Sequence, residues 1–392
     1  MTSSLQSYST IFYRSIDAIP KQIWEELQLV SQPYLKPEFL ESLEKNHQEI
    51  KFYYMILKNK ENKVVALANI KIIDFHLDNI TSYFENFLNK LKLVLRKIDI
   101  LPYKKPLKLL ITGNIFVSGE HGIFIKTNEN KKEIIKTIAK ATLVLEKDFN
   151  LKIDAFLLKD FLNESLTITD ELKDFNYHPF SVEPIMVLHI EKTWRSFDDY
   201  LHVLKTKFRV KAKKAFSLSK ELTIINITSN NIDDYLPKMN MLYKKVISKA
   251  TFNLSDFNLA TYKDLKLKFG ELYILKVYTL QGKVVGFLSG LIHNKNLDAH
   301  FVGIDYQLNK TFGIYQRMLY DYIQIAIENN LETLNFGRTA SEIKSSVGAK
   351  PVDLTMYLRH KRGLTNKILK LFLQRVQPTP FHQNFPFKIV EK

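Results

Sequence analysis

The amino-acid sequence predicts an α/β protein in which one order of elements occurs twice. In each half, two apolar runs flank a short polar turn, at residues 52–73 and 271–292, which indicates a β-hairpin. A strand, an amphipathic helix and another strand follow each hairpin. These elements are expected at Leu107–Val117, Lys131–Lys147 and Ile153–Leu158 in the first half, and at Leu297–Gly303, Gly313–Glu328 and Thr333–Phe336 in the second. A repeat on this scale indicates two copies of one fold rather than a solenoid of shorter repeats.

The length of 392 residues suits two domains. We expect the boundary near residue 190, because His178-Pro179 and Glu183-Pro184 interrupt regular structure just before it. The first domain, residues 1–190, is expected to carry a helical insert at 76–106 and to be closed by strand Ile185–Ile190. The second, residues 191–392, is expected to open with a basic helix at 197–219, to include a last sheet strand at Val352–Leu358, and to end with an amphipathic helix at 363–376 packed on it.

The composition limits the chemistry. With 45% hydrophobic and 25% charged residues the chain is typical of a globular protein. The absence of cysteine excludes disulfides, thiolate metal sites and a cysteine nucleophile, and it fits a reducing compartment. The first residues do not have the pattern of a signal peptide, and no apolar run is long enough to span a bilayer. We therefore expect a cytoplasmic protein, with peripheral contact at the inner membrane as the alternative.

The net charge of +16 points to a polyanionic partner, or else to lysines that merely decorate the surface. Its densest part is the run from Lys205 to Lys214, which holds six basic residues and no acidic one. Like charges at this density repel one another unless a polyanion neutralises them, although a solvated helix surface is the simpler interpretation. The residues expected to bind phosphates are Lys207, Arg209, Lys213 and Lys214.

A polar segment from Gly337 to Pro351 follows the strand that ends at Phe336. Small residues let the backbone approach a ligand, and functional groups tend to lie on loops held by a rigid sheet. Arg338 and Glu342 are four residues apart, so they form either an ordinary ion pair or a clamp for an anionic substrate group. The small residues beside Arg338 predict that it is exposed, and Lys344 and Lys350 would add positive charge.

Asp305 follows the strand that ends at Gly303, and it is expected either to act as a general base or to cap a turn. Tyr315 lies in the first turn of the helix predicted at 313–328. No His-x-x-x-His pair and no carboxylate cluster has metal-ligand spacing, so no metal site is expected.

This arrangement resembles the GNAT acyltransferase fold, and its duplication resembles the Fem-type peptidoglycan aminoacyl transferases and their BioF-like relatives in bacteria. The resemblance rests on the order of elements over residues 50–360 and on three short stretches. These are Val-Gly-Ile-Asp at 302–305, Phe-Gly-Ile-Tyr at 312–315 and Asn-Phe-Gly-Arg at 335–338. It implies two tandem GNAT-like domains, each with a mixed, mostly antiparallel sheet flanked by helices, and an active second domain.

The resemblance also implies roles for individual residues. Tyr315 would protonate the leaving group, and the catalytic set would be Asp305, Tyr315, Arg338 and Glu342. The donor would be bound by Gly303, Asn309, Lys310, Gly313 and Lys344. The acceptor would be bound by Asn335 and Lys350, with His121 of the first copy in support.

The implied activity is transfer of an acyl group to an amine of a cell-envelope, lipid or small-metabolite acceptor, with acyl-CoA as co-substrate. The link at 307–313 contains one glycine where CoA-binding relatives have two, so a larger donor such as aminoacyl-tRNA stays open. A non-enzymatic nucleic-acid-binding protein and a membrane-associated scaffold are two further hypotheses. The expected partners are a phosphate-bearing donor, tRNA or an anionic membrane surface, and the expected state is a monomer or dimer.

Overall fold

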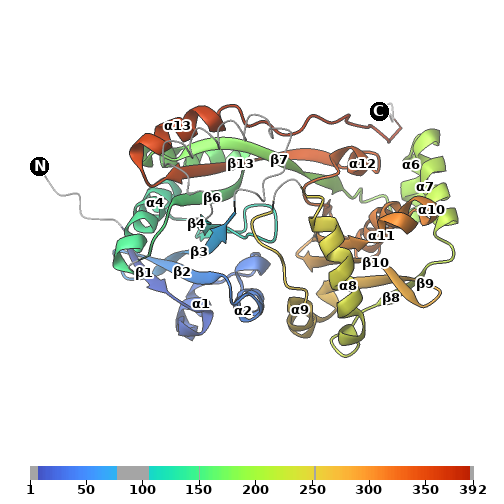
Figure 1. The fold of residues 1–392 in the computed structure, drawn as a ribbon, viewed down its shortest axis with the longest axis horizontal. Helices are drawn as coiled ribbons and strands as arrows, with labels where there is room; N and C mark the ends of the chain where they lie inside the picture. Colours follow the sequence, from blue (N-terminus) through green and yellow to red (C-terminus); the bar gives the residue numbers. More distant parts are fainter. Residues whose placement is uncertain (1–7, 77–105, 150, 251–252, 389–392) are drawn as a thin grey trace, which may run out of the picture. The chain divides into compact units, whose positions relative to one another are not determined.

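The computed structural model describes residues 8–76, 106–149, 151–250 and 253–388 (Figure 1). The chain divides into two compact units. Unit 1 comprises Met1–Val182, Ala250–Phe257 and Asp353–Pro378, and unit 2 comprises Glu183–Lys249, Asn258–Val352 and Thr379–Lys392. The predicted ranges 1–190 and 191–392 run without interruption along the chain, whereas each unit collects separate segments. Most of the predicted insert, residues 77–105, lies outside the described residues.

The sheet of unit 1 is mixed and mostly antiparallel. Its strands are β1 (Tyr8–Tyr13), β2 (Lys51–Asn59), β3 (Val64–Phe75), β4 (Leu107–Thr112), β6 (Ala155–Leu162) and β13 (Lys350–His360), in this order across the sheet, and the short β5 (Ile123–Ile125) also pairs with β3. Strands β4 and β6 pair in parallel, whereas their neighbours in the described part of this unit pair antiparallel. The predicted hairpin is confirmed as β2 and β3.

Helices cover both faces of this sheet. Tyr53 packs in the core beneath α4 (Lys131–Asp148), whereas its neighbour Tyr54 donates a hydrogen bond at 2.8 Å to Glu44 of α2 (Pro37–Asn46). Because successive strand residues point to opposite faces, α4 and α2 lie on opposite sides of the sheet. The described part of unit 1 also contains α1 (Lys21–Leu27), α5 (Leu166–Thr169) and α13 (Gly363–Leu373).

The sheet of unit 2 has the same plan. Its strands, in order across the sheet, are β7 (His178–His189), β12 (Thr333–Asn335), β11 (Asn296–Ile304), β10 (Lys283–His293), β9 (Tyr273–Leu280) and β8 (Thr223–Asn226). Among the described strands of this unit, β11 and β12 pair in parallel and the others pair antiparallel. Predicted strands at 297–303 and 333–336 are thus confirmed.

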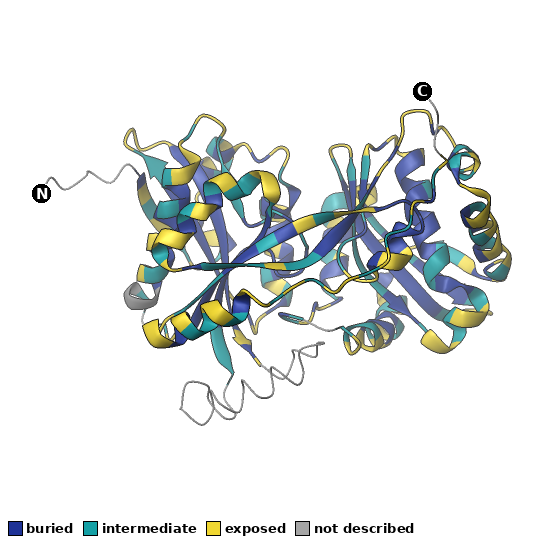
Figure 2. Ribbon diagram, turned by 90° about the horizontal axis from the view of Figure 1, so that it is seen from above, coloured by how far each residue is buried: buried dark blue, intermediate teal, exposed yellow. Residues whose placement is uncertain are grey.

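The predicted long helix is confirmed as α11 (Ile314–Glu328), whose inner side joins the main core of unit 2. With α6 (Phe197–Val203) and α7 (Thr206–Leu218) it covers one face of the sheet, while α8 (Ile232–Ile247) contacts β10 and β11. The other helices are α9 (Thr261–Phe269), α10 (Tyr306–Phe312) and α12 (Ser341–Ser345). Figure 2 shows that the strands and the inner helix faces hold most of the buried residues, in dark blue.

The prediction of one continuous helix at 197–219 is wrong. Helix α6 begins with a capping box between Ser196 and Asp199, and the chain becomes extended at Leu204 and Lys205 before α7 begins. The Lys205 amide donates to the carbonyl of Pro386, so the carboxyl-terminal segment occupies this break. The local pattern of apolar residues continues through the break, which is why the sequence does not reveal it.

Two sheet strands and the last helix differ from the prediction. Strand Ile185–Ile190 is expected to close the first copy, but Val187, Leu188 and His189 pair with β12 in unit 2. Conversely, β13 pairs with β6 in unit 1, and α13 also belongs to unit 1 rather than to the second domain. The two copies have therefore exchanged their final strands. A strand pattern identifies a strand but not its partner, because pairing depends on distant parts of the chain.

No helix of the described residues combines the length and the apolar character that a bilayer span requires.

Candidate functional site

The parallel strands of unit 2 separate along their length. Strand β12 pairs with β11 only from Asn296 to Asp298, and β11 then continues to Ile304. After β12 the chain follows β7 instead, because Phe336 and Gly337 exchange backbone hydrogen bonds with Met186 at 2.8 and 3.1 Å. In the described part of unit 2, residues 299–304 of β11 therefore have no strand partner on this side. This stretch of β11 therefore forms a sheet edge, and a ligand can add backbone hydrogen bonds at such an edge.

The same part of β11 carries an irregularity. Leu288 of β10 pairs with Val302, and Gly290 pairs with Ala299. Between these two pairs β10 has one residue and β11 has two, so β11 contains one extra residue. A bulge of this kind bends a strand and re-aims its backbone groups, and bulges are frequent beside active sites. His300 lies in the bulge, and its Nδ1 is 3.2 Å from the hydroxyl of Tyr273.

The link after β11 is a helix rather than the open loop that the sequence suggests. Asp305 caps α10, because its Oδ1 accepts from the amides of Gln307 and Leu308 at 3.0 and 3.4 Å. Gly313, with φ +58°, then turns the chain into α11. Asn309 Oδ1 accepts from the Tyr315 amide at 2.8 Å. One amide at the start of α11, next to the residues expected to bind the donor, is thus already occupied by a side chain of the protein.

The other residues expected beside this helix have different surroundings. Burial raises the pKa of the Tyr315 phenol, so the hydroxyl stays protonated. Lys310 is exposed on α10. Gly303 is buried, and a Cβ there would lie 2.2 Å from Phe287 Cε1 and 2.9 Å from Leu242 Cβ. Close packing of β11 against β10 and α8 is a sufficient reason for this glycine.

We expect Gly303→Ala to lower the free energy of unfolding by roughly 1–3 kcal/mol, because the new methyl group overlaps a buried ring. Gly363→Ala is the matched control, since no atom lies within 4 Å of the place that its new methyl group would take at the start of α13. Thermal unfolding of both variants tests the difference. An unchanged melting temperature combined with lost activity would assign Gly303 to ligand binding instead.

The polar segment after Phe336 folds back on itself around α12. Thr339 and Ala340 have φ of +65° and +51°, so the backbone reverses its direction there. The side chain of Lys344 is buried inside this turn. The Lys344 ammonium donates to the carbonyls of Gly337 and Arg338 at 3.2 and 2.6 Å. Burial lowers the pKa of Lys344 to about 7. Lys344 therefore braces the segment from inside rather than adding to the surface charge.

Arg338 is half-buried, not exposed as the sequence suggests, and burial lowers its pKa to about 10. The small neighbours that predict its exposure instead allow the backbone turn that encloses it. Glu342 and Lys350 are exposed. Asn335 uses its Oδ1 to accept from the Gly337 amide at 2.9 Å, which fixes the start of the turn.

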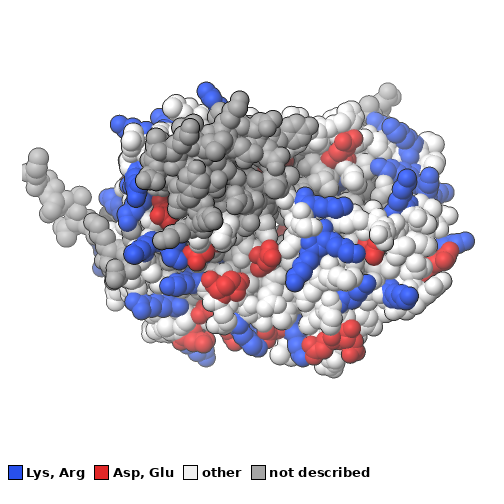
Figure 3. All heavy atoms as spheres, in the orientation of Figure 1, with Lys and Arg blue, Asp and Glu red and all other residues white. Residues whose placement is uncertain are grey.

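The basic helix α7 meets this segment. Lys211 Nζ donates to Ser346 Oγ, just after α12, at 3.3 Å. Burial lowers the pKa of Lys211, and the Glu342 carboxylate opposes this effect. The expected phosphate-binding residues Lys207, Lys213 and Lys214 are exposed, and Arg209 is half-buried. Figure 3 shows Lys and Arg side chains gathered over α7, so the structure brings the two predicted regions of unit 2 together.

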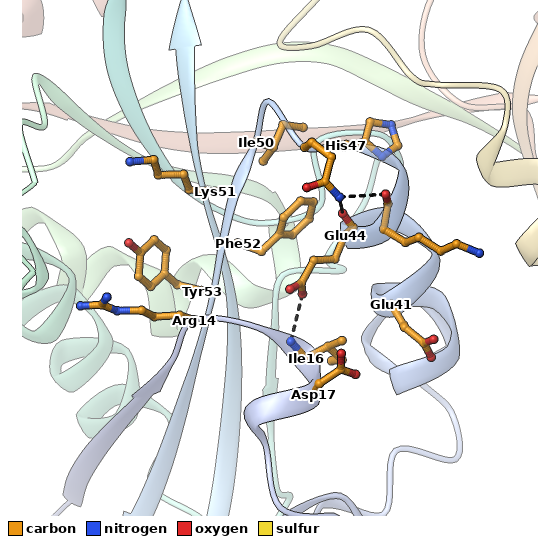
Figure 4. A pocket seen from close by; sticks show the side chains of 12 residues that line it. Arg14, Ile16, Asp17, Glu41, Glu44, His47, Ile50, Lys51, Phe52 and Tyr53 are labelled. Carbon is orange, nitrogen blue, oxygen red and sulfur yellow. Dashed lines mark hydrogen bonds between the residues drawn. The ribbon is translucent and has the colours of Figure 1, made fainter.

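Unit 1 contains a separate pocket of about 520 Å³ beside α2 (Figure 4). Arg14, Lys45 and Lys51 line it together with the carboxylates of Asp17, Glu41 and Glu44. The Glu44 carboxylate accepts from the Ile16 amide at 3.0 Å, and burial raises its pKa. His121, expected to support acceptor binding, also lies in unit 1, where its ring packs 4.3 Å from that of Tyr34. No cluster of potential metal ligands occurs among the described residues of either unit.

Comparison with known proteins shows the fold. No family model matches the sequence. No curated protein matches it either. Among solved structures, FemX is similar over 92% of this chain and 100% of its own, with a TM-score of 0.55 and 11% identity. A tandem GNAT protein from the clavulanic acid biosynthesis pathway is similar over 90% of this chain and 98% of its own, with a TM-score of 0.53 and 8% identity.

The chain has a tandem GNAT fold. The fold class expected from the sequence is therefore confirmed, down to the mixed and mostly antiparallel sheets. In this tandem GNAT chain, the diverging strands β11 and β12, the junction of α10 with α11, and helix α7 define the candidate site of unit 2.

Proposed function

We propose that this tandem GNAT protein is an N-acyltransferase and that unit 2 carries the reaction. An acceptor amine attacks the carbonyl carbon of an activated acyl donor, the new C–N bond forms, and the thiol or hydroxyl of the donor leaves. The observation that carries the proposal is the end of the β11–β12 pairing at Asp298, which leaves the rest of β11 as a sheet edge in the described part of unit 2. Backbone N–H groups at such an edge stabilise the negative charge that develops on the carbonyl oxygen.

The proton of the amine must be removed during this reaction. Asp305 stands at the end of β11, and its Oδ1 is engaged in capping α10. Its Oδ2 is not used in this cap and lies 3.9 Å from Lys245 Nζ. We propose this oxygen, or a water molecule, as the base. Tyr315, which stays protonated, is the proposed acid for the leaving group, and Arg338 and Glu342 are proposed contacts of the substrate.

Two classes of donor bear the phosphates that α7 would bind. Acyl-CoA is the first, held by Lys310, Gly313 and the start of α11. Aminoacyl-tRNA is the second, and one observation favours it. The Tyr315 amide already bonds Asn309, and α10 fills the link that would otherwise offer free amides to a pyrophosphate. A donor that relies on the exposed cations of α7 does not need those amides.

The test compares donors and variants in binding and transfer assays. We expect Lys207→Gln/Lys213→Gln/Lys214→Gln to weaken binding of the true donor at least tenfold, because three exposed cations are lost. For a tRNA donor, each lost phosphate contact should also reduce the slope of log affinity against log salt by about 0.7–0.9. The probes are acetyl-CoA, a long-chain acyl-CoA, free CoA and aminoacyl-tRNA, each at two salt concentrations.

Lys60→Gln/Lys63→Gln/Lys283→Gln is the matched control, since it removes three exposed lysines from hairpin turns. An equal loss in both triple variants would mean that total charge, not α7, attracts the donor. Binding of tRNA without any transfer to an amine would favour a plain nucleic-acid-binding protein. Failure of every probe to bind would overturn the proposed donor chemistry.

A further inference from the structure

Strand β3 of unit 1 carries two polar residues that are completely buried. Asn69 and Lys71 are both 0% exposed, and because they are two positions apart their side chains lie on the same face. Neither polar atom of the Asn69 side chain has a hydrogen-bond partner among the described residues. Lys71 Nζ donates to the carbonyl of Gly113 at 3.0 Å. Buried polar groups without partners are rare, so each one calls for an explanation.

A third polar group belongs to the same place. The Gly113 amide donates to the backbone carbonyl of Asn69 at 3.0 Å, so Gly113 contacts both Asn69 and Lys71. The next residue, Asn114, is 1% exposed, and its Oδ1 accepts from the amides of Phe116 and Val117. Its Nδ2 lacks a partner in the described part of the chain. Asn69, Lys71 and Asn114 are here called the Lys71 cluster: the first two contact Gly113, through the Asn69 carbonyl and the Lys71 ammonium, and Asn114 follows Gly113 in the chain.

The charges around the Lys71 cluster are unbalanced. Lys159 and Asp160 of β6 are nearly or fully buried, and they form an ion pair with each other. Asp160 also accepts from the Gly119 amide at 3.2 Å, so its charge is already compensated. His47 faces the cluster from the end of α2, and burial lowers its pKa, which keeps the ring neutral. Glu44 of α2 lies on the same face of the sheet, but its carboxylate accepts from Tyr54, which is directly opposite Asn69, and burial raises its pKa. Among the described residues no carboxylate forms an ion pair with Lys71, so the protonated Lys71 is a buried charge without an ionic partner there.

The Lys71 cluster also has more hydrogen-bond donors than acceptors. An ammonium group has three donors, of which Lys71 uses one for Gly113, and each amide nitrogen has two. The Nδ2 groups of Asn69 and Asn114 use none among the described residues, and the buried side-chain acceptor Asn69 Oδ1 is also unused there. What is missing is therefore an acceptor with negative charge. Water would satisfy the donors but would leave the buried charge uncompensated.

The geometry points to a binding site in unit 1 for a small oxyanion, a carboxylate or phosphate group, held by Lys71, Asn69 and Asn114. The pocket beside α2 adjoins this place through Phe52. Phe52 lines that pocket, and the register of β2 and β3 places Phe52 directly opposite Lys71, with the ammonium 5.7 Å from the ring centroid. His47 lines the pocket as well (Figure 4). The inference does not depend on the reaction proposed for unit 2.

Binding of the oxyanion should depend on pH. Burial, reinforced by the charge of Lys159, lowers the pKa of Lys71 to about 7 in the free protein. The oxyanion binds to the protonated form of Lys71. Above pH 7 Lys71 is mostly neutral in the free protein, so it must take up a proton when the oxyanion binds. The affinity should then fall about tenfold for each pH unit above 7, in contrast to binding at the permanently charged surface lysines.

The first experiment measures the melting temperature of the full chain in sodium acetate and in sodium phosphate. Sodium chloride at equal ionic strength is the reference, and the α7 triple variant is included to remove the competing phosphate site. We expect a rise of roughly 4 °C or more at saturation near pH 6.5 and a much smaller rise at pH 8.5. A response to acetate alone identifies a carboxylate site, and a response to phosphate alone identifies a phosphate site. Equal melting temperatures in acetate, phosphate and chloride would overturn the inference.

Two variants locate the effect. Lys71→Met should abolish the shift caused by the anion. Asn69→Asp should raise the melting temperature without added anion and remove the response to it, because the new carboxylate supplies the missing charge inside the protein. Asn366→Asp is the control, as this asparagine is also buried in unit 1 but already has partners, His360 and Asn176. If Asn69→Asp lowers the melting temperature as the control does, the Lys71 cluster is a hydrated polar core and not an anion site.

Discussion

Replacing Asp321 by alanine is expected to lower the free energy of unfolding by about 3–5 kcal/mol, because it leaves a partly buried guanidinium without its partner. Arg317 Nε donates to Asp321 Oδ1 at 2.8 Å along α11. The hydroxyl of Tyr278, on β9, donates to Asp321 Oδ2 at 2.5 Å. Burial raises the pKa of Tyr278, and the Asp321 charge raises it further, so the phenol remains a donor.

This network also holds the basic helix. Arg317 Nη1 donates to Ser219 Oγ, at the end of α7, at 3.1 Å, and the guanidinium lies 4.4 Å from the centroid of the Phe216 ring. Loss of Asp321 should therefore reduce donor binding as well as stability, because α7 loses its fixed contact with α11.

Asp233→Ala provides the control for this experiment. Asp233 is paired with Lys263, but both side chains are more than half exposed, so the expected cost is about 0–1 kcal/mol. Urea and thermal unfolding of the two variants give the comparison. Similar losses in both would show that the Arg317–Asp321–Tyr278 network adds nothing beyond an ordinary surface pair.

The elements of the fold can be predicted where their signal is local. Helix α11 has apolar residues at helical spacing, and the hairpin of β2 and β3 has two apolar runs around a polar turn. Such patterns depend on neighbours along the chain, and the predicted and observed bounds differ by only a few residues. The duplicated order of these elements is sufficient to indicate the tandem GNAT fold.

The exchange of strands cannot be predicted in the same way. Val187 and its neighbours have the pattern of a buried strand, and nothing in that pattern distinguishes β12 of unit 2 from a strand of unit 1. The same holds for β13, whose pairing with β6 joins residues almost two hundred positions apart, as in the contact of Thr355 with Phe161. Long-range pairing is decided by the whole fold.

The sequence locates the regions of the site better than the roles of their residues. Asp305 is predicted to be either a base or a cap, and the structure shows the cap. Lys344 is predicted to add surface charge, because a sequence does not reveal that a lysine points inward beneath its own turn. Asn69 and Lys71 are absent from the predicted site, although two polar residues inside the apolar run from Val64 to Ile73 are a visible signal of a buried polar site.

Lys344 should make the stability of the protein depend on pH. Burial lowers its pKa from 10.5 to about 7, so between these values the unfolded chain binds a proton that the folded chain does not. The free energy of unfolding should then increase with pH over this range, by up to about 1.4 kcal/mol per pH unit. Below pH 7 both states are protonated, and this contribution no longer changes with pH.

Comparison with Lys344→Met isolates the effect, because Lys71 contributes equally to both proteins and cancels. From pH 7 to pH 9 the wild type should gain up to about 3 kcal/mol relative to the variant. Lys310→Met, at an exposed position on α10, should show no such difference. Parallel stability curves for wild type and Lys344→Met would mean that Lys344 is solvated in the folded protein. A confirmed difference would mean that above pH 7 the turn around Gly337 and Arg338 closes on a neutral amine, so that this part of the candidate site loses stability as the pH falls towards 7.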